Sequence, residues 1–215
     1  MTIALFGKLG RRPVIGLRPT LDAAFALASD RAADERTDLS GGQRFASVSR
    51  GDAADAFEGF VRAHERELFG YLWRVTGDEH ASYDLAQETF VRAWQRFDQV
   101  RGYEQPRAWL FRVATNLASN YRRARSVRVA AAIPLTGETE YAGDPATNIA
   151  ESDAVRVALD EMPVKQRSAL LLRAVYGFSV SELARALDCS EAAAKMTLSR
   201  ARERFRAHYR QEESR

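Results

Sequence analysis

The sequence is poor in the features that build disulfides, metal sites and membrane spans. Its 215 residues include one cysteine, Cys189, which excludes an internal disulfide. The histidines, His64, His80 and His208, are scattered without the spacing of metal ligands. No apolar run approaches the roughly 18 residues that a membrane-spanning helix needs, and the first residues do not resemble a signal peptide. We therefore expect a cytoplasmic protein with no membrane insertion, no metal and no other cofactor.

Catalytic motifs are also missing. The sequence has no Gly-rich phosphate loop and no visible pairing of a nucleophile with a base, so we predict no catalytic residues and no enzymatic activity. What it does contain is 28% charged and 46% hydrophobic residues, the balance of a globular protein. Its length is enough for two small modules.

The charges are segregated along the chain. Residues 52–100 have 5 basic and 10 acidic side chains, whereas residues 101–128 have 7 basic and 1 acidic. Residues 129–155 have 5 acidic and no basic side chains, and residues 156–215 have 12 basic and 8 acidic. Two basic blocks around an acidic stretch are typical of two nucleic-acid contact surfaces joined by a tether. Each block alone is also compatible with an ordinary solvated face.

Apolar spacing predicts an all-α protein with two small helical domains joined by a flexible acidic linker. The first domain covers residues 53–128 and the second residues 153–210. Between them, residues 129–152 contain two prolines and two glycines but no Lys or Arg, which is typical of a linker. Residues 1–52 have one short apolar pattern and are interpreted as a flexible N-terminal extension.

In the first domain the pattern predicts three helices. Two are expected over about 54–77 and 80–97, and the third begins at Pro106, whose missing N–H is not needed in a first turn. The polar stretch 98–105 is predicted to be a loop.

The second domain is predicted to end in a helix-turn-helix. Ser179 and Glu182 have the spacing of a capping box, which begins a helix. Asp188 tolerates the left-handed backbone of a tight turn, and Ser190 can cap the next helix. That last helix, about 191–209, has the basic surface of a recognition helix, whose first turns reach base edges.

Two stretches resemble the extracytoplasmic-function (ECF) group of bacterial RNA polymerase sigma factors. Asp84–Trp94 and Pro106–Ala118 (DLAQETFVRAW and PRAWLFRVATNLA) resemble sigma region 2, and Pro163–Arg206, with YGFS and LSRAR, resembles sigma region 4. The resemblance implies a region 2 helical bundle and a region 4 helix-turn-helix. It also implies a promoter-specificity subunit that binds polymerase core, recognises the minus-thirty-five and minus-ten elements and helps to melt DNA.

The resemblance implies a polymerase-docking face on the second helix. In the family this helix docks on the clamp coiled coil of the largest polymerase subunit, which here points to Asp84, Leu85, Gln87, Glu88, Phe90 and Trp94. For Phe90 and Trp94, packing in the core is the alternative.

The resemblance also implies two DNA-contact surfaces. Minus-ten contact, in which a flipped base is captured by stacking, edge hydrogen bonds and phosphate contacts, is expected from Arg101, Tyr103, Trp109, Arg112, Asn116, Asn120, Tyr121, Arg122, Arg123 and Arg125. Packing is the alternative for Trp109. Minus-thirty-five contact is expected from Ser190, Glu191, Ala192, Lys195, Met196, Ser199, Arg200 and Arg202. Family members often carry Val-Lys-Ser-Arg where Ala194–Thr197 stands here, so we expect a different or weaker recognition.

The expected partners are bacterial RNA polymerase core, promoter DNA and an anti-sigma factor. The acidic linker is interpreted either as a mimic of RNA in a positive polymerase channel or as a solvated tether. A free-standing helix-turn-helix regulator is the alternative function, but such a protein has no use for the clamp-docking motif.

Overall fold

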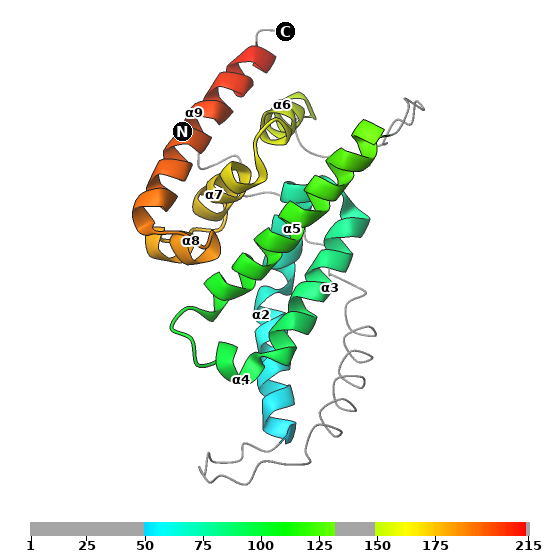
Figure 1. The fold of residues 1–215 in the computed structure, drawn as a ribbon, viewed down its shortest axis with the longest axis vertical. Coiled ribbons are helices and arrows are strands. Elements are labelled where there is room, and N and C mark those ends of the chain that lie inside the picture. The colour runs from blue at the N-terminus through cyan, green and yellow to red at the C-terminus, as the bar shows by residue number, and fades with distance from the viewer. Residues whose placement is uncertain (1–49, 132–148, 214–215) are drawn as a thin grey trace.

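The structure, a computed structural model, describes residues 50–131 and 149–213, which form helices and no strand (Figure 1). The first range contains α2 (Arg50–Thr76), α3 (Glu79–Gln95), α4 (Phe97–Val100) and α5 (Pro106–Ala131). The second contains α6 (Ile149–Asp160), α7 (Val164–Ala174), α8 (Val180–Ala186) and α9 (Glu191–Glu213). The all-α prediction is confirmed for these ranges, in which no helix is long and apolar enough to span a bilayer. Residues 1–49 of the expected N-terminal extension and 132–148 of the expected linker lie outside the described residues. The ends of both predicted segments are wrong, because 50–52 begin α2, 129–131 end α5 and 149–152 begin α6.

Helices α2, α3 and α5 pack side by side around a common apolar core (Figure 1). Their apolar residues recur every three or four positions, so each helix buries one face, with Leu72, Phe90 and Leu110 fully buried. The turn between α2 and α3 uses Gly77 at φ +71°, and Asp78 then caps α3 by accepting a hydrogen bond of 2.9 Å from the Ala81 amide. These local signals hold the first two helices together as a hairpin.

The predicted loop 98–105 is partly wrong, because α4 occupies its beginning. Phe97 and Val100 turn into the core, where the ring of Phe97 lies 4.9 Å from the ring of Phe57. Their burial favours one more helical turn after α3 ends at Gln95. The loop proper is therefore confined to residues 101–105.

The helix-turn-helix prediction is confirmed at α8 and α9. The Glu182 amide donates to Ser179 Oγ at 3.2 Å, and the Ser179 amide donates to Glu182 Oε2 at 2.7 Å, which closes the capping box. Asp188 has φ 52° in the turn, and the Ser190 hydroxyl accepts from the Ala193 amide at 3.2 Å. The chain therefore enters α9 with the geometry that its local sequence specifies.

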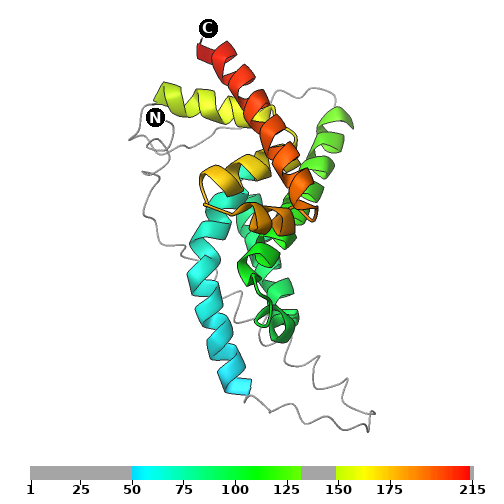
Figure 2. The same ribbon diagram turned by 90° about the vertical axis from the view of Figure 1, so that its left-hand side faces the viewer.

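The two helical modules are in contact. Helices α7 and α8 lie against α5, and α7 also touches α2, as both ribbon views show (Figures 1 and 2). Phe178, which precedes α8, is fully buried with its ring 5.1 Å from the ring of Phe111 on α5. The hydroxyl of Tyr71 on α2 lies 2.6 Å from the Thr115 hydroxyl on α5 and donates to Ser168 Oγ on α7 at 2.8 Å. The described parts of the chain thus share a single core.

Candidate nucleic-acid interface

The outward face of α9 is open. Ala194, Leu198 and Ala201 are buried against the rest of the second module, which turns the opposite side of the helix to the surface. All the residues predicted for minus-thirty-five contact are exposed there, namely Ser190, Glu191, Ala192, Lys195, Met196, Ser199, Arg200 and Arg202. Within the described ranges, no hydrogen bond or ion pair engages Lys195, Arg200 or Arg202. Their charges are therefore available to a ligand.

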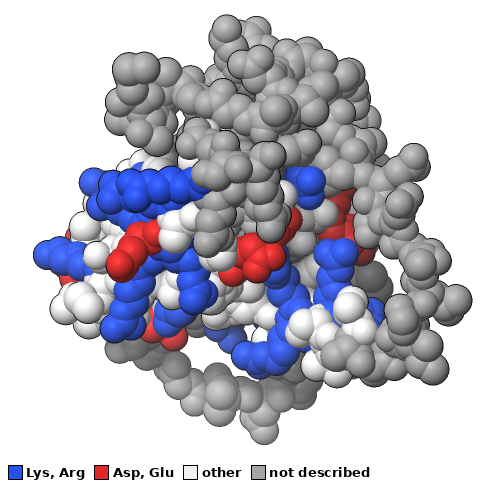
Figure 3. Space-filling view, turned by 90° about the horizontal axis from the view of Figure 1, so that it is seen from above, with Lys and Arg blue, Asp and Glu red and all other residues white. Residues whose placement is uncertain are grey.

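A shallow hollow beside this face is lined by cations. Lys195, Arg202 and Arg206 of α9 face Arg173 at the end of α7, and Glu203 is the one carboxylate among its described lining residues. Residues spaced by four or seven lie on one side of a helix, so these cations form a row along α9. Seen from above, Lys and Arg side chains cover much of the described surface, with fewer Asp and Glu among them (Figure 3). Such a row of cations is suited to contact the phosphate groups along a DNA strand.

The α5 surface is only partly open. Of the residues predicted for minus-ten contact, the exposed ones are Arg101, Tyr103, Asn116, Asn120 and Arg123, and the half-buried ones are Arg112, Tyr121, Arg122 and Arg125. Trp109 is 8% exposed and packs near Tyr103, with 6.3 Å between ring centroids. The ring of Trp109 is thus covered in this arrangement, which favours the alternative that it packs in the core. Tyr103, 41% exposed, is the accessible ring of the loop.

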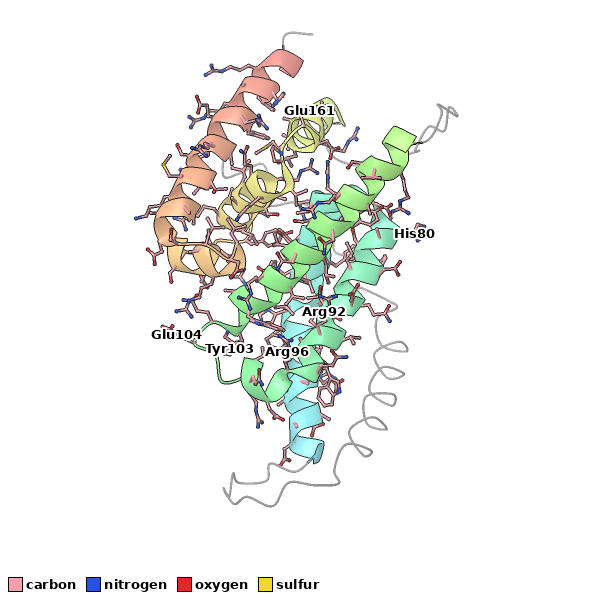
Figure 4. The ribbon with its side chains drawn as sticks, viewed as in Figure 1. His80, Arg92, Arg96, Tyr103, Glu104 and Glu161 are labelled. Carbon is pink, nitrogen blue, oxygen red and sulfur yellow. The ribbon has the colours of Figure 1, made fainter. Side chains whose placement is uncertain are left out.

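The second module covers this part of α5 through two ion pairs. Arg112 donates to Asp188 Oδ1 at 3.2 Å, and Arg185 of α8 donates to Glu104 Oε2 at 2.6 Å. Figure 4 shows Tyr103 and Glu104 in the loop before α5, on the side toward α8. A small hollow between the pairs is lined by residues of both modules, including Trp109. The helix-turn-helix thus sits over the candidate minus-ten surface.

Two further predicted residues are held farther along α5. The Tyr121 hydroxyl donates to Asp78 Oδ2 at 2.7 Å, and this hydrogen bond is the main reason why the pKa of Asp78 lies below its ordinary value. Arg122 donates to the Val75 carbonyl at 3.1 Å and to Asp160 Oδ1 at 3.4 Å, the latter from α6. Both side chains are therefore engaged by protein rather than open to solvent.

A buried arginine under this contact was missed in the sequence. Arg167 of α7 has 0% exposure and donates from Nη1 to the Val75 carbonyl at 2.9 Å and to Asp160 Oδ1 at 2.8 Å. Burial lowers its pKa to about 10, and its Nε and Nη2 have no partner within the described residues. No local signal marks it, because Val75 is 92 positions away.

Arg107 was also missed, and it joins three elements. Its Nε donates to Glu67 Oε2 on α2 at 3.1 Å, and its Nη2 donates to the Tyr176 carbonyl at 2.7 Å. The guanidinium lies 4.1 Å from the centroid of the Phe178 ring. A cation over an aromatic face is attracted by the ring quadrupole, so Arg107 ties α2 and α5 to the second module.

The predicted docking face on α3 is smaller than expected. Asp84 and Glu88 are exposed, Gln87 and Trp94 are half-buried, and Leu85 is at the edge of burial. Phe90 is wrong as a contact residue, because it is 0% exposed and belongs to the core. The ring of Trp94 packs 5.1 Å from the ring of Phe57, and part of the side chain stays exposed, so the structure is compatible with both alternatives.

Both modules match known protein families. Residues 60–128 match the Sigma-70 region 2 family, and residues 152–205 match the Sigma-70 region 4 family. The chain is 32% identical to the ECF RNA polymerase sigma factor SigG of Mycobacterium tuberculosis over 187 residues, which cover 75% of this chain and 50% of SigG. It is also 32% identical to SigL of the same species, over 71% of this chain and 89% of SigL. The chain thus spans about half the length of SigG but most of SigL.

The fold is also similar to a solved structure. The sigma factor RpoE from Bartonella quintana, in complex with the anti-sigma factor NepR, superposes with a TM-score of 0.58 at 22% identity. The match covers 73% of this chain and 98% of RpoE. At this identity the likeness concerns the fold alone.

Proposed function

The chain belongs to the extracytoplasmic-function family of RNA polymerase sigma factors, and from this premise we propose that it is a promoter-specificity subunit. In this role it binds polymerase core in the cytoplasm, recognises the two promoter elements and helps to melt DNA, with no catalytic residues of its own. An anti-sigma factor is a further proposed partner, as NepR is for RpoE. The proposed domains are region 2 at 53–128 and region 4 at 153–210, with 129–152 between them.

The open face of α9 carries this proposal. A recognition helix needs exposed polar groups at its first turns for base edges and cations farther along for phosphates. Lys195 and Ser199 supply the first, and Arg200, Arg202 and Arg206 supply the second, all on the surface. Minus-thirty-five contact is therefore assigned to this face.

We assign minus-ten contact to the loop at 101–105 and the following part of α5. Tyr103 offers a ring for an unstacked base, whereas Asn116 and Asn120 offer amide groups for base edges. Arg123 is exposed for a phosphate, and Arg112 and Arg122 join it once Asp188 and Asp160 release them. The carboxylates of the second module thus occupy cations that DNA would use.

The distance between the promoter elements requires the modules to separate. Elements at minus ten and minus thirty-five are about 25 base pairs apart, roughly 85 Å along the duplex. Two modules that share one core cannot reach both elements together. Residues 132–148 have an extended length of about 60 Å, which, added to the modules themselves, covers this span.

Polymerase docking is assigned to the exposed side of α3. Asp84 and Glu88 supply charge, Gln87 an amide, and Leu85 and Trp94 apolar edges. Phe90 supports this face from below as part of the core. The free-standing regulator is set aside, because the region 2 match covers the docking helix.

Transcription in vitro tests the proposal. The purified protein is added to sigma-free bacterial core polymerase on fragments of its own genome. Specific transcripts that depend on the protein are expected, and their aligned upstream regions give both elements. Specific DNA binding without any transcript would overturn the proposal in favour of the free-standing regulator.

A further inference from the structure

Met196 is an exception on the surface of α9. It is 55% exposed, and the other large hydrophobic side chains exposed in the described ranges, Tyr103, Val127 and Val129, all belong to the first module. A lone exposed hydrophobic residue is ordinary on a protein surface. This one, however, lies in the part of the recognition helix that is assigned to base contact.

The position of Met196 directs it away from the protein. Ala194 and Leu198, on either side in the sequence, are buried, whereas Ala192 and Arg200, four positions before and after it, are exposed. Residues four apart share a helix face, so Ala192, Met196 and Arg200 form one outward row. The first turns of a recognition helix face the floor of the major groove, so Ala192 and Met196 are directed toward the bases, whereas Arg200 lies one turn farther along.

The chemistry of the side chain limits what it can read. A thioether is at most a weak hydrogen-bond acceptor, so it cannot satisfy the amino or carbonyl groups of base edges. Against guanine or cytosine it would remove water from those groups without replacing their hydrogen bonds. The feature of the major groove that it complements is the C5 methyl group of thymine.

We propose that Met196 reads a thymine of the minus-thirty-five element through its C5 methyl group. The inference rests on the proposed function and deepens it, because it names a base at one position of the element. Ala192 presents a methyl group about 6 Å earlier along the helix axis, which extends the apolar contact toward a neighbouring base pair. Lys195, the preceding residue, flanks the contact with a donor suited to guanine.

Uracil substitution tests the contact directly. Deoxyuridine pairs as thymidine does but lacks the methyl group, so each thymine of the minus-thirty-five element is replaced in turn in a promoter found by transcription. Binding by the holoenzyme is measured for the unmodified chain, Met196→Ala and Thr197→Ala. Thr197 is the matched control, since it is the next residue but half-buried, with its hydroxyl donating to the Ala193 carbonyl at 2.8 Å.

With the unmodified chain, one deoxyuridine position is expected to weaken binding by about fourfold, the factor for one buried methyl group. Met196→Ala should bind the thymine promoter more weakly and lose its sensitivity at that position, whereas Thr197→Ala keeps it. Equal binding of all duplexes by the unmodified chain, or undiminished sensitivity in Met196→Ala, would overturn the inference while leaving the sigma function intact. A protein that gives no specific promoter would remove both.

Discussion

The two candidate DNA surfaces are both cationic, but they differ in what holds their charges. On α9, Lys195, Arg200 and Arg202 have no partner among the described residues, whereas on α5 Arg112 and Arg122 are paired with Asp188 and Asp160. Both of these carboxylates come from the other module. The charge of a segment therefore shows where DNA could bind. The contacts between the modules determine whether the cations of that segment are free to bind it.

The largest expected effect is on stability, and it distinguishes the contact between the modules from the open face of α9. Phe178→Ala removes a fully buried ring that packs on Phe111 and under Arg107, so the free energy of unfolding should fall by about 3–5 kcal/mol. Met196→Ala, on the open face, should change it by less than about 0.5 kcal/mol. Urea unfolding of the full chain, followed by circular dichroism, measures both. Similar losses in the two variants would contradict the comparison.

Salt dependence tests the open face. With Arg200 and Arg202 both changed to Ala, two phosphate contacts disappear, and the slope of log affinity against log salt should become shallower by about two. Promoter binding by the holoenzyme is titrated from low to high salt. Arg62→Ala is the control, because Arg62 is an exposed arginine of α2 paired with Glu58. An unchanged slope in the double variant would remove these arginines from the interface.

On the covered α5 surface we expect a smaller effect, which is an increase in DNA binding rather than a decrease. Asp188→Asn with Glu104→Gln removes both ion pairs between α8 and the α5 region, and asparagine tolerates the left-handed backbone at position 188. Because exposed pairs are weak, binding of single-stranded minus-ten DNA should improve by about threefold to tenfold. Glu58→Gln, which breaks an ion pair within α2, should leave that binding unchanged. Weaker binding in the double variant would show that these carboxylates do not compete with DNA.

The smallest effect concerns the hydrogen bond between Tyr121 and Asp78. Because this bond lowers the pKa of Asp78, its contribution to stability is present above the ordinary pKa near 4 and is lost as pH falls through the lowered value. Tyr121→Phe should therefore cost up to about 1 kcal/mol at pH 7, and the difference from the unmodified chain should shrink in acid. Urea unfolding at pH 7 and pH 3 measures it, with Tyr103→Phe as the exposed control. A constant difference at both pH values would exclude this cause.

The features that could be predicted were those that depend on residues close together in the sequence. Ser179 and Glu182 are three positions apart, and the turn at Asp188 lies between two short helices, so propensity and capping rules were sufficient. The apolar stripe of α3 belongs to the same class. It already placed Phe90 on a buried face, and the docking role came from the resemblance alone.

The contact between modules was not predictable from such rules. Tyr71 meets Ser168 across 97 positions, and Arg107 meets Tyr176 across 69. Phe178 and Phe111 are 67 positions apart, so no local rule required them to meet. Val100 was missed for a related reason, since its polar neighbours on both sides are typical of a loop.

Two buried tyrosines at the contact between the modules can report on it through their absorbance. Burial raises the pKa of both Tyr71 and Tyr176 to about 12, whereas an ordinary tyrosine ionises near pH 10. In a chain whose modules have parted, these two phenols meet water and ionise at the ordinary pH. At pH 11 these two phenols therefore add to the tyrosinate absorbance of the other five tyrosines mainly in open molecules, and the same alkali, by charging the two rings, disfavours the closed form.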